Sequence, residues 1–85
     1  MTLAQIRNAV EMTTHPELSQ LLALLIQHGG LTVGAAAPLL DLPHFMVLRF
    51  ADRLVCLGYA TQVQGSYFAT ISGREIDAVM QGRRR

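Results

Sequence analysis

Residues 40–59, LDLPHFMVLRFADRLVCLGY, decide the fold of this chain. Asp41-Leu42-Pro43 predicts a tight turn, because proline fixes its own φ and keeps the residue before it out of the helical region. Beyond the turn, apolar residues recur at the spacing of a helix, which predicts a helix over 44–57 that ends at Gly58. The residues expected to anchor that helix in the core are Leu42, Val47, Phe50, Leu54 and Leu57.

A short alanine-rich helix is predicted over 33–40, directly before the turn, with Thr32 as its N-cap. Ala37 is small enough to let this helix approach the next one closely. The turn requires a residue that tolerates a left-handed backbone, and we assign that role to Asp41. Two helices joined in this way form a helix-turn-helix.

Two β-prone segments, 59–63 and 66–70, follow that pair and are joined around Gln64-Gly65, which predicts a β-hairpin. Ser72-Gly73-Arg74-Glu75 has the spacing of a capping box and predicts a last helix over 72–81. The chain is therefore expected to be mainly α with a small β-hairpin, in the arrangement of a winged helix-turn-helix whose wing covers 59–70.

Two more helices are predicted ahead of residue 30. The second starts at Thr14-His15-Pro16-Glu17, where Thr14 is expected to be the cap, and stops at Gly29-Gly30. The first covers 2–12 and carries an apolar stripe on one face, formed by Leu3, Ile6 and Val10. A helix this short is marginal alone and must dock, so the stripe either packs on its own domain or forms a dimerisation surface with a second copy.

The composition is that of one globular domain over residues 1–85. Hydrophobic residues make up 51% of the chain and charged residues 15%, which excludes intrinsic disorder as its main description. The longest apolar run, Leu21 to Ile26, is far shorter than the roughly 20 residues that span a bilayer, and the first residues lack the pattern of a secretory signal. We therefore expect a soluble cytoplasmic protein with no membrane partner.

No constellation of residues in the sequence indicates catalysis or metal binding. His15, His28 and His44 are too far apart for a metal site on one helix. Cys56, the single cysteine, excludes an internal disulfide and has no neighbouring histidine to activate it as a nucleophile. Gly29-Gly30 is a helix stop rather than a phosphate-binding loop. We expect no enzymatic activity, no cofactor and no metal.

The stretch 40–59 resembles the recognition-helix segment of bacterial winged-helix regulators, of the types named for multiple antibiotic resistance and for isocitrate lyase regulation. In those proteins an apolar-x-Leu-Ser/Pro turn precedes Val-x-Arg and then Leu-x-x-Leu-Gly-Tyr. The corresponding motifs here are Leu40 to Pro43, Val47 to Arg49 and Leu54 to Tyr59. Tyr67 to Gly73 is similar to the second wing strand and to the Thr-x-x-Gly that starts the next helix. The resemblance covers about residues 14–80 and implies a DNA-binding transcription regulator that forms homodimers.

That resemblance places the helix 44–57 in the major groove of double-stranded DNA. The residues it implicates in DNA binding are His44, Phe45, Leu48, Arg49, Arg53, Gln64, Arg83, Arg84 and Arg85. All seven basic residues are arginines, and residues 1–82 hold four of them against six carboxylates. The tail 83–85 is either a solvated end of the chain or, in the functional interpretation, a phosphate contact that supplies the positive charge the rest of the chain lacks.

A second function is open on the same fold. Winged-helix regulators usually carry polar residues on the outward side of this helix, because base edges and phosphates require hydrogen bonds. An exposed apolar patch would form there instead, from Phe45, Leu48, Val55 and Cys56. Exposed apolar patches mark partner sites, so the alternative to DNA binding is a protein–protein interaction module that uses Phe45 and Leu48.

Overall fold

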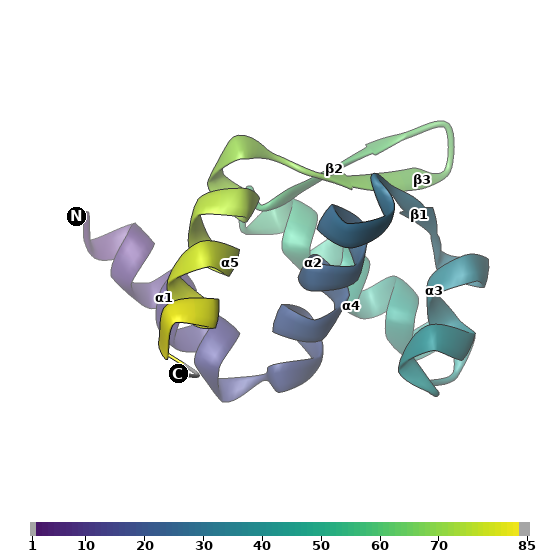
Figure 1. Cartoon of the computed structure of the whole chain (residues 1–85), viewed down its shortest axis with the longest axis horizontal. Coiled ribbons are helices and arrows are strands. Elements are labelled where there is room, and N and C mark those ends of the chain that lie inside the picture. Colours follow the sequence, from purple (N-terminus) through teal and green to yellow (C-terminus); the bar gives the residue numbers. More distant parts are fainter. Residues whose placement is uncertain (1, 84–85) are drawn as a thin grey trace.

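In the computed structural model, which describes residues 2–83, five helices pack with a small antiparallel sheet that lies along one edge of the molecule (Figure 1). The helices are α1 (Leu3–Thr14), α2 (Pro16–His28), α3 (Val33–Leu40), α4 (His44–Cys56) and α5 (Ile71–Arg83). The strands are β1 (Leu31–Thr32), β2 (Ala60–Val63) and β3 (Ser66–Ala69). The predicted class, mainly α with a small β-hairpin, is confirmed, and the helix expected over 44–57 ends one residue earlier.

A turn of three residues joins α3 to α4, and the helix direction changes by 111° between them. Asp41 adopts the left-handed backbone that the turn requires, with φ 55° and ψ 45°. Its N–H donates to the carbonyl of Pro38, and the N–H of Leu42 donates to the carbonyl of Ala37 over 3.2 Å, which closes the end of α3. At the start of α3, the Thr32 hydroxyl accepts a bond of 3.1 Å from a backbone N–H of the first turn, as predicted.

β3 is the central strand of the sheet, because the strand order is β1-β3-β2 and both pairs are antiparallel. Tyr67 in β3 lies opposite Leu31 on one side and Gln62 on the other. The hairpin turns at Gln64 and Gly65, whose φ values of 50° and 83° are both positive, as a two-residue type I′ turn requires. β1, at residues 31–32, becomes the third strand of the sheet by pairing with β3.

The core lies between α2, α4 and the sheet, and α1 and α3 pack against it. The largest fully buried side chains are Met12, Leu18, Leu21, Leu22, Leu25, Val47 and Leu54. Two of the predicted anchors, Val47 and Leu54, are therefore confirmed as buried. The other three, Leu42, Phe50 and Leu57, are partly buried against the same core. At the approach of α3 to α4, Ala36 is the buried alanine and Ala37 is partly buried beside it.

The boundary between α1 and α2 differs from the prediction, because α1 continues to Thr14. The Thr14 hydroxyl donates to the carbonyl of Val10 at 2.8 Å, a bond within α1. The prediction that Thr14 caps α2 is therefore wrong. The N-cap is His15, whose side chain makes no capping bond, while Pro16 occupies the first turn and Gly29 ends the helix with a φ of 69°, both as predicted.

The start of α5 is capped by Thr70, so the predicted capping box at Ser72 is wrong. The Thr70 hydroxyl accepts a bond of 3.0 Å from the N–H of Gly73 and donates to the carbonyl of Gly58 at 2.7 Å. The Thr70 N–H also donates to the carbonyl of Tyr59 at 3.0 Å. Gly73 packs so closely on this segment that a Cβ would collide with the Tyr59 carbonyl oxygen. The first turn of α5 is thus fixed to the segment that follows α4.

Replacing Leu54 by Ala should lower the free energy of unfolding by about 2–5 kcal/mol, because a fully buried leucine leaves a cavity. Chemical denaturation measures this difference. The control is Leu48→Ala on the same helix, where the side chain is exposed and the decrease should be much smaller. Equal decreases in the two variants would contradict the assignment of the buried side of α4.

Candidate nucleic-acid interface

The outward side of α4, opposite its buried side, carries four of the residues predicted to contact DNA. They are His44, Phe45, Leu48 and Arg49, all exposed and all within the first two turns of the helix, and we call them the outer face of α4. Phe45 is 62% exposed and Leu48 is 39% exposed. The structure therefore brings these four residues together on one surface, and two of them are apolar.

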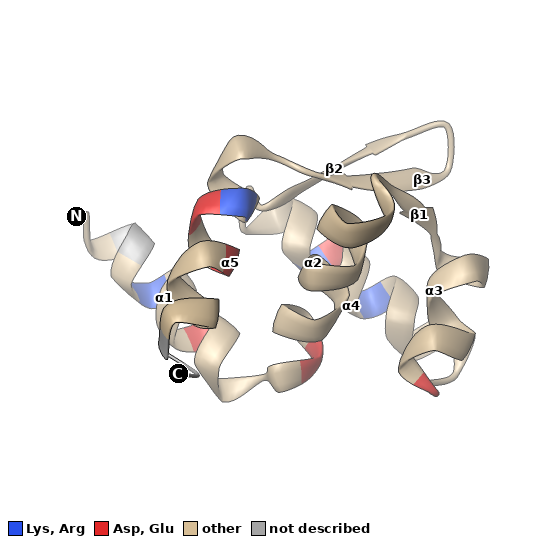
Figure 2. Cartoon of the chain, in the orientation of Figure 1, with Lys and Arg blue, Asp and Glu red and all other residues tan. Residues whose placement is uncertain are grey.

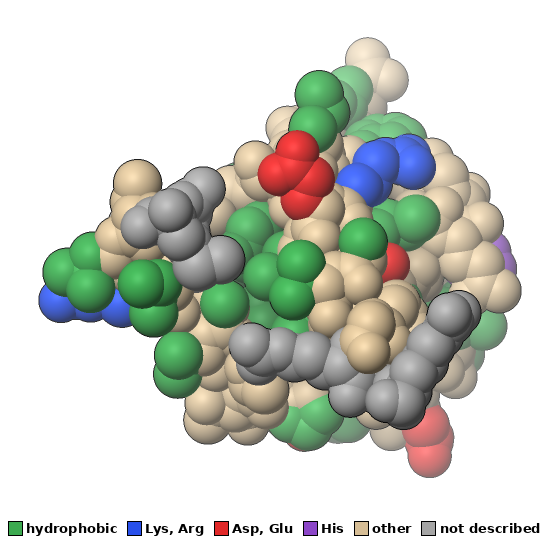
Figure 3. Space-filling view, turned by 60° about the vertical axis from the view of Figure 1, so that its left-hand side comes forward, with side chains coloured by type: hydrophobic (Ala, Val, Ile, Leu, Met, Phe, Trp, Pro, Cys, Tyr) green, Lys and Arg blue, Asp and Glu red, His purple; other side chains and the backbone are tan. Residues whose placement is uncertain are grey.

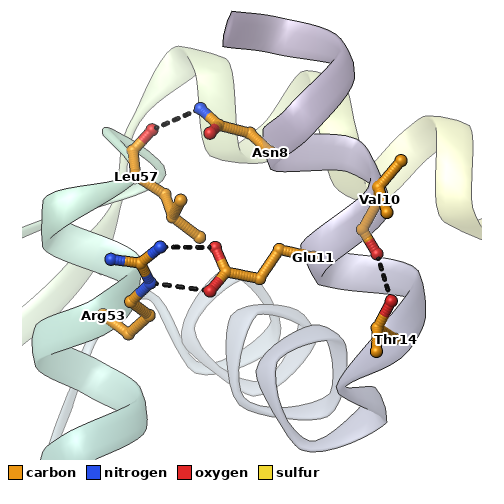
Figure 4. A network of polar contacts seen from close by, with 6 residues as sticks. All are labelled: Asn8, Val10, Glu11, Thr14, Arg53 and Leu57. Carbon is orange, nitrogen blue, oxygen red and sulfur yellow. Dashed lines mark hydrogen bonds and ion pairs between the residues drawn. The ribbon is translucent and has the colours of Figure 1, made fainter.

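Arg53 lies at the edge of α4 that faces α1, where it is held by Glu11 (Figure 4). Its Nε and Nη2 atoms donate to the two carboxylate oxygens at 2.8 and 2.9 Å. The hydrogen bond from Arg53 is the main cause of a lowered pKa at Glu11, so the carboxylate is ionised and offsets the charge of Arg53. Beside this pair, the Asn8 amide donates to the carbonyl of Leu57 at 3.4 Å. Arg53 thus connects α4 to α1. The sequence does not indicate that Glu11 is the partner of Arg53.

Arg49 is the arginine of α4 that is available to a ligand. Within residues 2–83 its guanidinium makes no hydrogen bond and no ion pair. It borders an open groove of about 510 Å³ between the α1–α2 corner and α4, lined also by Glu11, His15, Leu18, Met46, Phe50 and Arg53. Sequence patterns miss this groove because its two walls lie far apart along the chain.

Asp52, one turn beyond Arg49, is bonded to the sheet. The hydroxyl of Tyr67 in β3 donates to its Oδ1 atom at 2.7 Å, and the Tyr67 side chain is only 2% exposed. Burial, followed by the bond to Asp52 and the charge of that carboxylate, raises the pKa of Tyr67 to about 12. The bond holds the β2–β3 hairpin beside α4 and takes up one oxygen of the carboxylate.

The remaining predicted DNA contacts lie at the hairpin tip and at the end of the chain. Gln64 is exposed in the two-residue turn of the hairpin. Residues 60–69 contain no Lys, Arg, Asp or Glu, so this hairpin brings no charge toward a ligand (Figure 2). Of the three tail arginines, Arg83 ends α5, and Arg84 and Arg85 lie outside the described residues.

The apolar stripe of α1 faces away from the domain. Leu3, Ile6 and Val10 are between 45% and 65% exposed, and Figure 3 shows hydrophobic side chains gathered on this side of the molecule. Exposed Val79 of α5 lines a groove of about 470 Å³ whose α1 wall is Asn8 and includes none of the three stripe residues. Met12, which helical periodicity did not single out, is the fully buried residue that docks α1 on its own domain.

Other kinds of site find no support in the part of the chain that is described. Residues 2–83 contain no group of three or more His, Cys, Asp or Glu side chains placed to hold a metal ion. In the same range no single helix is long and apolar enough to cross a membrane. Taken together, the bent pair of α3 and α4 has sufficient length and apolar composition, but nothing beyond length and composition indicates a membrane span. Comparison with protein-family models, curated proteins and solved structures finds no match to this chain.

The titration of Tyr67 tests the bond between the hairpin and α4. The tyrosinate absorbance should show this residue ionising near pH 12, and Asp52→Asn should bring its pKa closer to 10 by removing the carboxylate charge. Because the pKa is raised in the folded state, this phenol stabilises the domain below about pH 10, and that stabilisation is lost as the pH rises toward 12. In the control, Tyr59→Phe, the Tyr67 titration should persist. An Asp52→Asn curve identical to the parent's would argue against the bond.

Proposed function

We propose that this chain is a DNA-binding transcription regulator of the winged helix-turn-helix class. The observation that carries the proposal is the α3–α4 pair, with its turn of three residues and its change of direction of 111°. Helix-turn-helix units use a turn of 3–4 residues and a crossing of roughly 90–120°. The hairpin β2–β3 is bonded to α4 through Tyr67, and in this proposal it would act as the wing beside α4.

In this proposal α4 enters the major groove with its N-terminal turns toward the bases. Recognition helices contact base edges through their N-terminal residues, and these turns carry the outer face of α4. Arg49 has five N–H donors in a planar fork and is suited to the O6 and N7 acceptors of a guanine. His44, exposed at the first position of the helix, provides a second polar group. Arg53 acts indirectly, because its bonds to Glu11 fix α4 against α1.

Phosphate binding in this proposal depends on few cations. Four of the seven arginines lie before the tail 83–85, and one of these four, Arg53, is already paired with Glu11. Each neutralised phosphate contributes about −0.9 to the slope of log affinity against log salt concentration. We therefore propose that Arg83, Arg84 and Arg85 add contacts to the DNA phosphate backbone. We also expect the affinity for DNA to fall only gradually as the salt concentration rises.

We also propose that the regulator is a homodimer that associates through the apolar stripe of α1. Met12 docks the inner side of α1 on its own domain, so that Leu3, Ile6 and Val10 remain exposed for a second copy. A two-fold dimer would place two copies of α4 at half-sites about one helical turn apart, roughly 34–36 Å.

The second candidate function is a protein-interaction module on the same fold. It is favoured by one observation, the exposure of Phe45 and Leu48 at the centre of the surface that DNA would occupy. Such a module would bury Phe45 as an aromatic anchor in its partner and would bind duplex DNA weakly or not at all.

Arg49→Ala should weaken specific DNA binding by about 1–3 kcal/mol, because it removes one bidentate base contact. Mobility shifts against a duplex selected from a random pool, at two salt concentrations, measure the change. Arg74→Ala is the matched control, since it removes the same charge from the exposed surface of α5. Equal weakening in both variants would show that only net charge matters. Absence of any salt-dependent binding by the parent would favour the protein-interaction module.

Val10→Glu should convert the dimer to a monomer that stays folded, because the side chain is exposed in the single domain but would be buried between two copies. Sedimentation velocity measures the mass, and circular dichroism checks the fold. Val63→Glu provides the control, since Val63 is similarly exposed on β2. A parent that sediments as a monomer at all concentrations would contradict the proposed dimer.

A further inference from the structure

The first two turns of α4 present an unusual surface for reading DNA. Phe45 is 62% exposed, Leu48 is 39% exposed, and the free guanidinium of Arg49 lies one turn beyond Phe45 on the same side. The guanidinium of Arg49 is therefore the one permanent cation on a surface that also carries the ring of Phe45 and the aliphatic side chain of Leu48. If this surface enters the major groove, most of the area it buries there is apolar.

Two polar side chains in the second half of α4 are already bonded to other elements, while Val55 and Cys56 are exposed there. The carboxylate of Asp52 accepts the Tyr67 hydroxyl at 2.7 Å, and Arg53 is bound to Glu11 through two hydrogen bonds. β2 also packs against α4 on this side of the domain. The polar side chains of α4 that remain available to bases, His44 and Arg49, therefore lie on the outer face of α4, in the N-terminal half of the helix.

The major groove offers an apolar side chain one kind of partner. Base edges there present hydrogen-bond donors and acceptors, and the exception is the C5-methyl group of thymine. Covering polar edges with a phenyl ring would leave them without hydrogen bonds, which costs free energy. A 5-methylcytosine carries its methyl group on the same ring carbon, so it presents the same apolar surface.

We propose that the outer face of α4 reads a C5-methylated pyrimidine, thymine or 5-methylcytosine, close to a guanine. Phe45 and Leu48 contact the methyl group, and Arg49 donates to the O6 and N7 atoms of the guanine. Four residues of helix rise about 6 Å, so Phe45 and Arg49 are separated by about two base-pair steps of 3.4 Å. This inference rests on the DNA-binding function proposed above and names the feature of the duplex that is recognised.

Three random-sequence duplex pools test the proposal at one low salt concentration. The first contains the standard bases, the second contains uracil in place of every thymine, and the third contains uracil together with 5-methylcytosine in place of cytosine. The uracil pool should bind about four-fold more weakly for each thymine methyl group that the helix would otherwise bury, the ratio expected for one methyl-sized group. The pool with 5-methylcytosine should recover binding.

Two variants identify the side chains responsible. The double variant Phe45→Ala/Leu48→Ala should bind the standard and uracil pools equally, whereas Ile71→Ala, which removes another exposed apolar side chain from α5, should keep the difference. Equal binding of all pools by the parent would overturn methyl reading and leave DNA binding intact. A thymine preference that persists in the double variant Phe45→Ala/Leu48→Ala would also overturn it, because the methyl groups would then act through duplex shape. Failure to bind any pool would overturn the proposed function itself.

Discussion

The hydrogen bond from Tyr67 to Asp52 fixes the arrangement on which the proposed binding surface depends. Tyr67 belongs to the central strand, so a single residue is paired with β1 and β2 and also bonded to α4. A buried hydroxyl without a partner would cost on the order of 1–3 kcal/mol. Asp52 supplies that partner from α4, and the hairpin is consequently held in one position beside the helix.

Bonds within the domain explain why carboxylates occur on or beside the surface that is proposed to bind DNA. Asp52 and Glu11 would each repel a phosphate, but each accepts hydrogen bonds from within the domain, from Tyr67 and Arg53 respectively. Their charges hold β3 and α1 against α4. These charged side chains thus contribute to the cohesion of the domain, and in the proposed function recognition would fall to apolar side chains and Arg49. Affinity for a duplex would then depend less on counterion release than it does for strongly basic proteins.

The sequence predicts most helices and the hairpin because their signals are local, such as the turn at Asp41 and the Gln64-Gly65 pair. Helical spacing also predicts the outer face of α4. The predicted caps of two helices are wrong because neighbouring hydroxyls compete for the same role: Thr14 bonds back into α1, and Thr70 caps α5 ahead of Ser72. The partner of Arg53 lies 42 residues away, and such a pairing depends on how α1 packs against α4, which periodicity does not encode.

The close packing around Gly73 and Thr70 also determines where this fold tolerates change. Both ends of the hairpin meet there, since β2 begins directly after Tyr59 and β3 ends directly before Thr70. The turn at residues 64–65 lies at the opposite, exposed end. Extra residues or new charges at that tip would leave the base undisturbed, whereas one residue inserted at the base would displace α5 and the end of α4 together. The structure therefore tolerates a longer turn at the tip of the hairpin better than a change at its attachment to the domain.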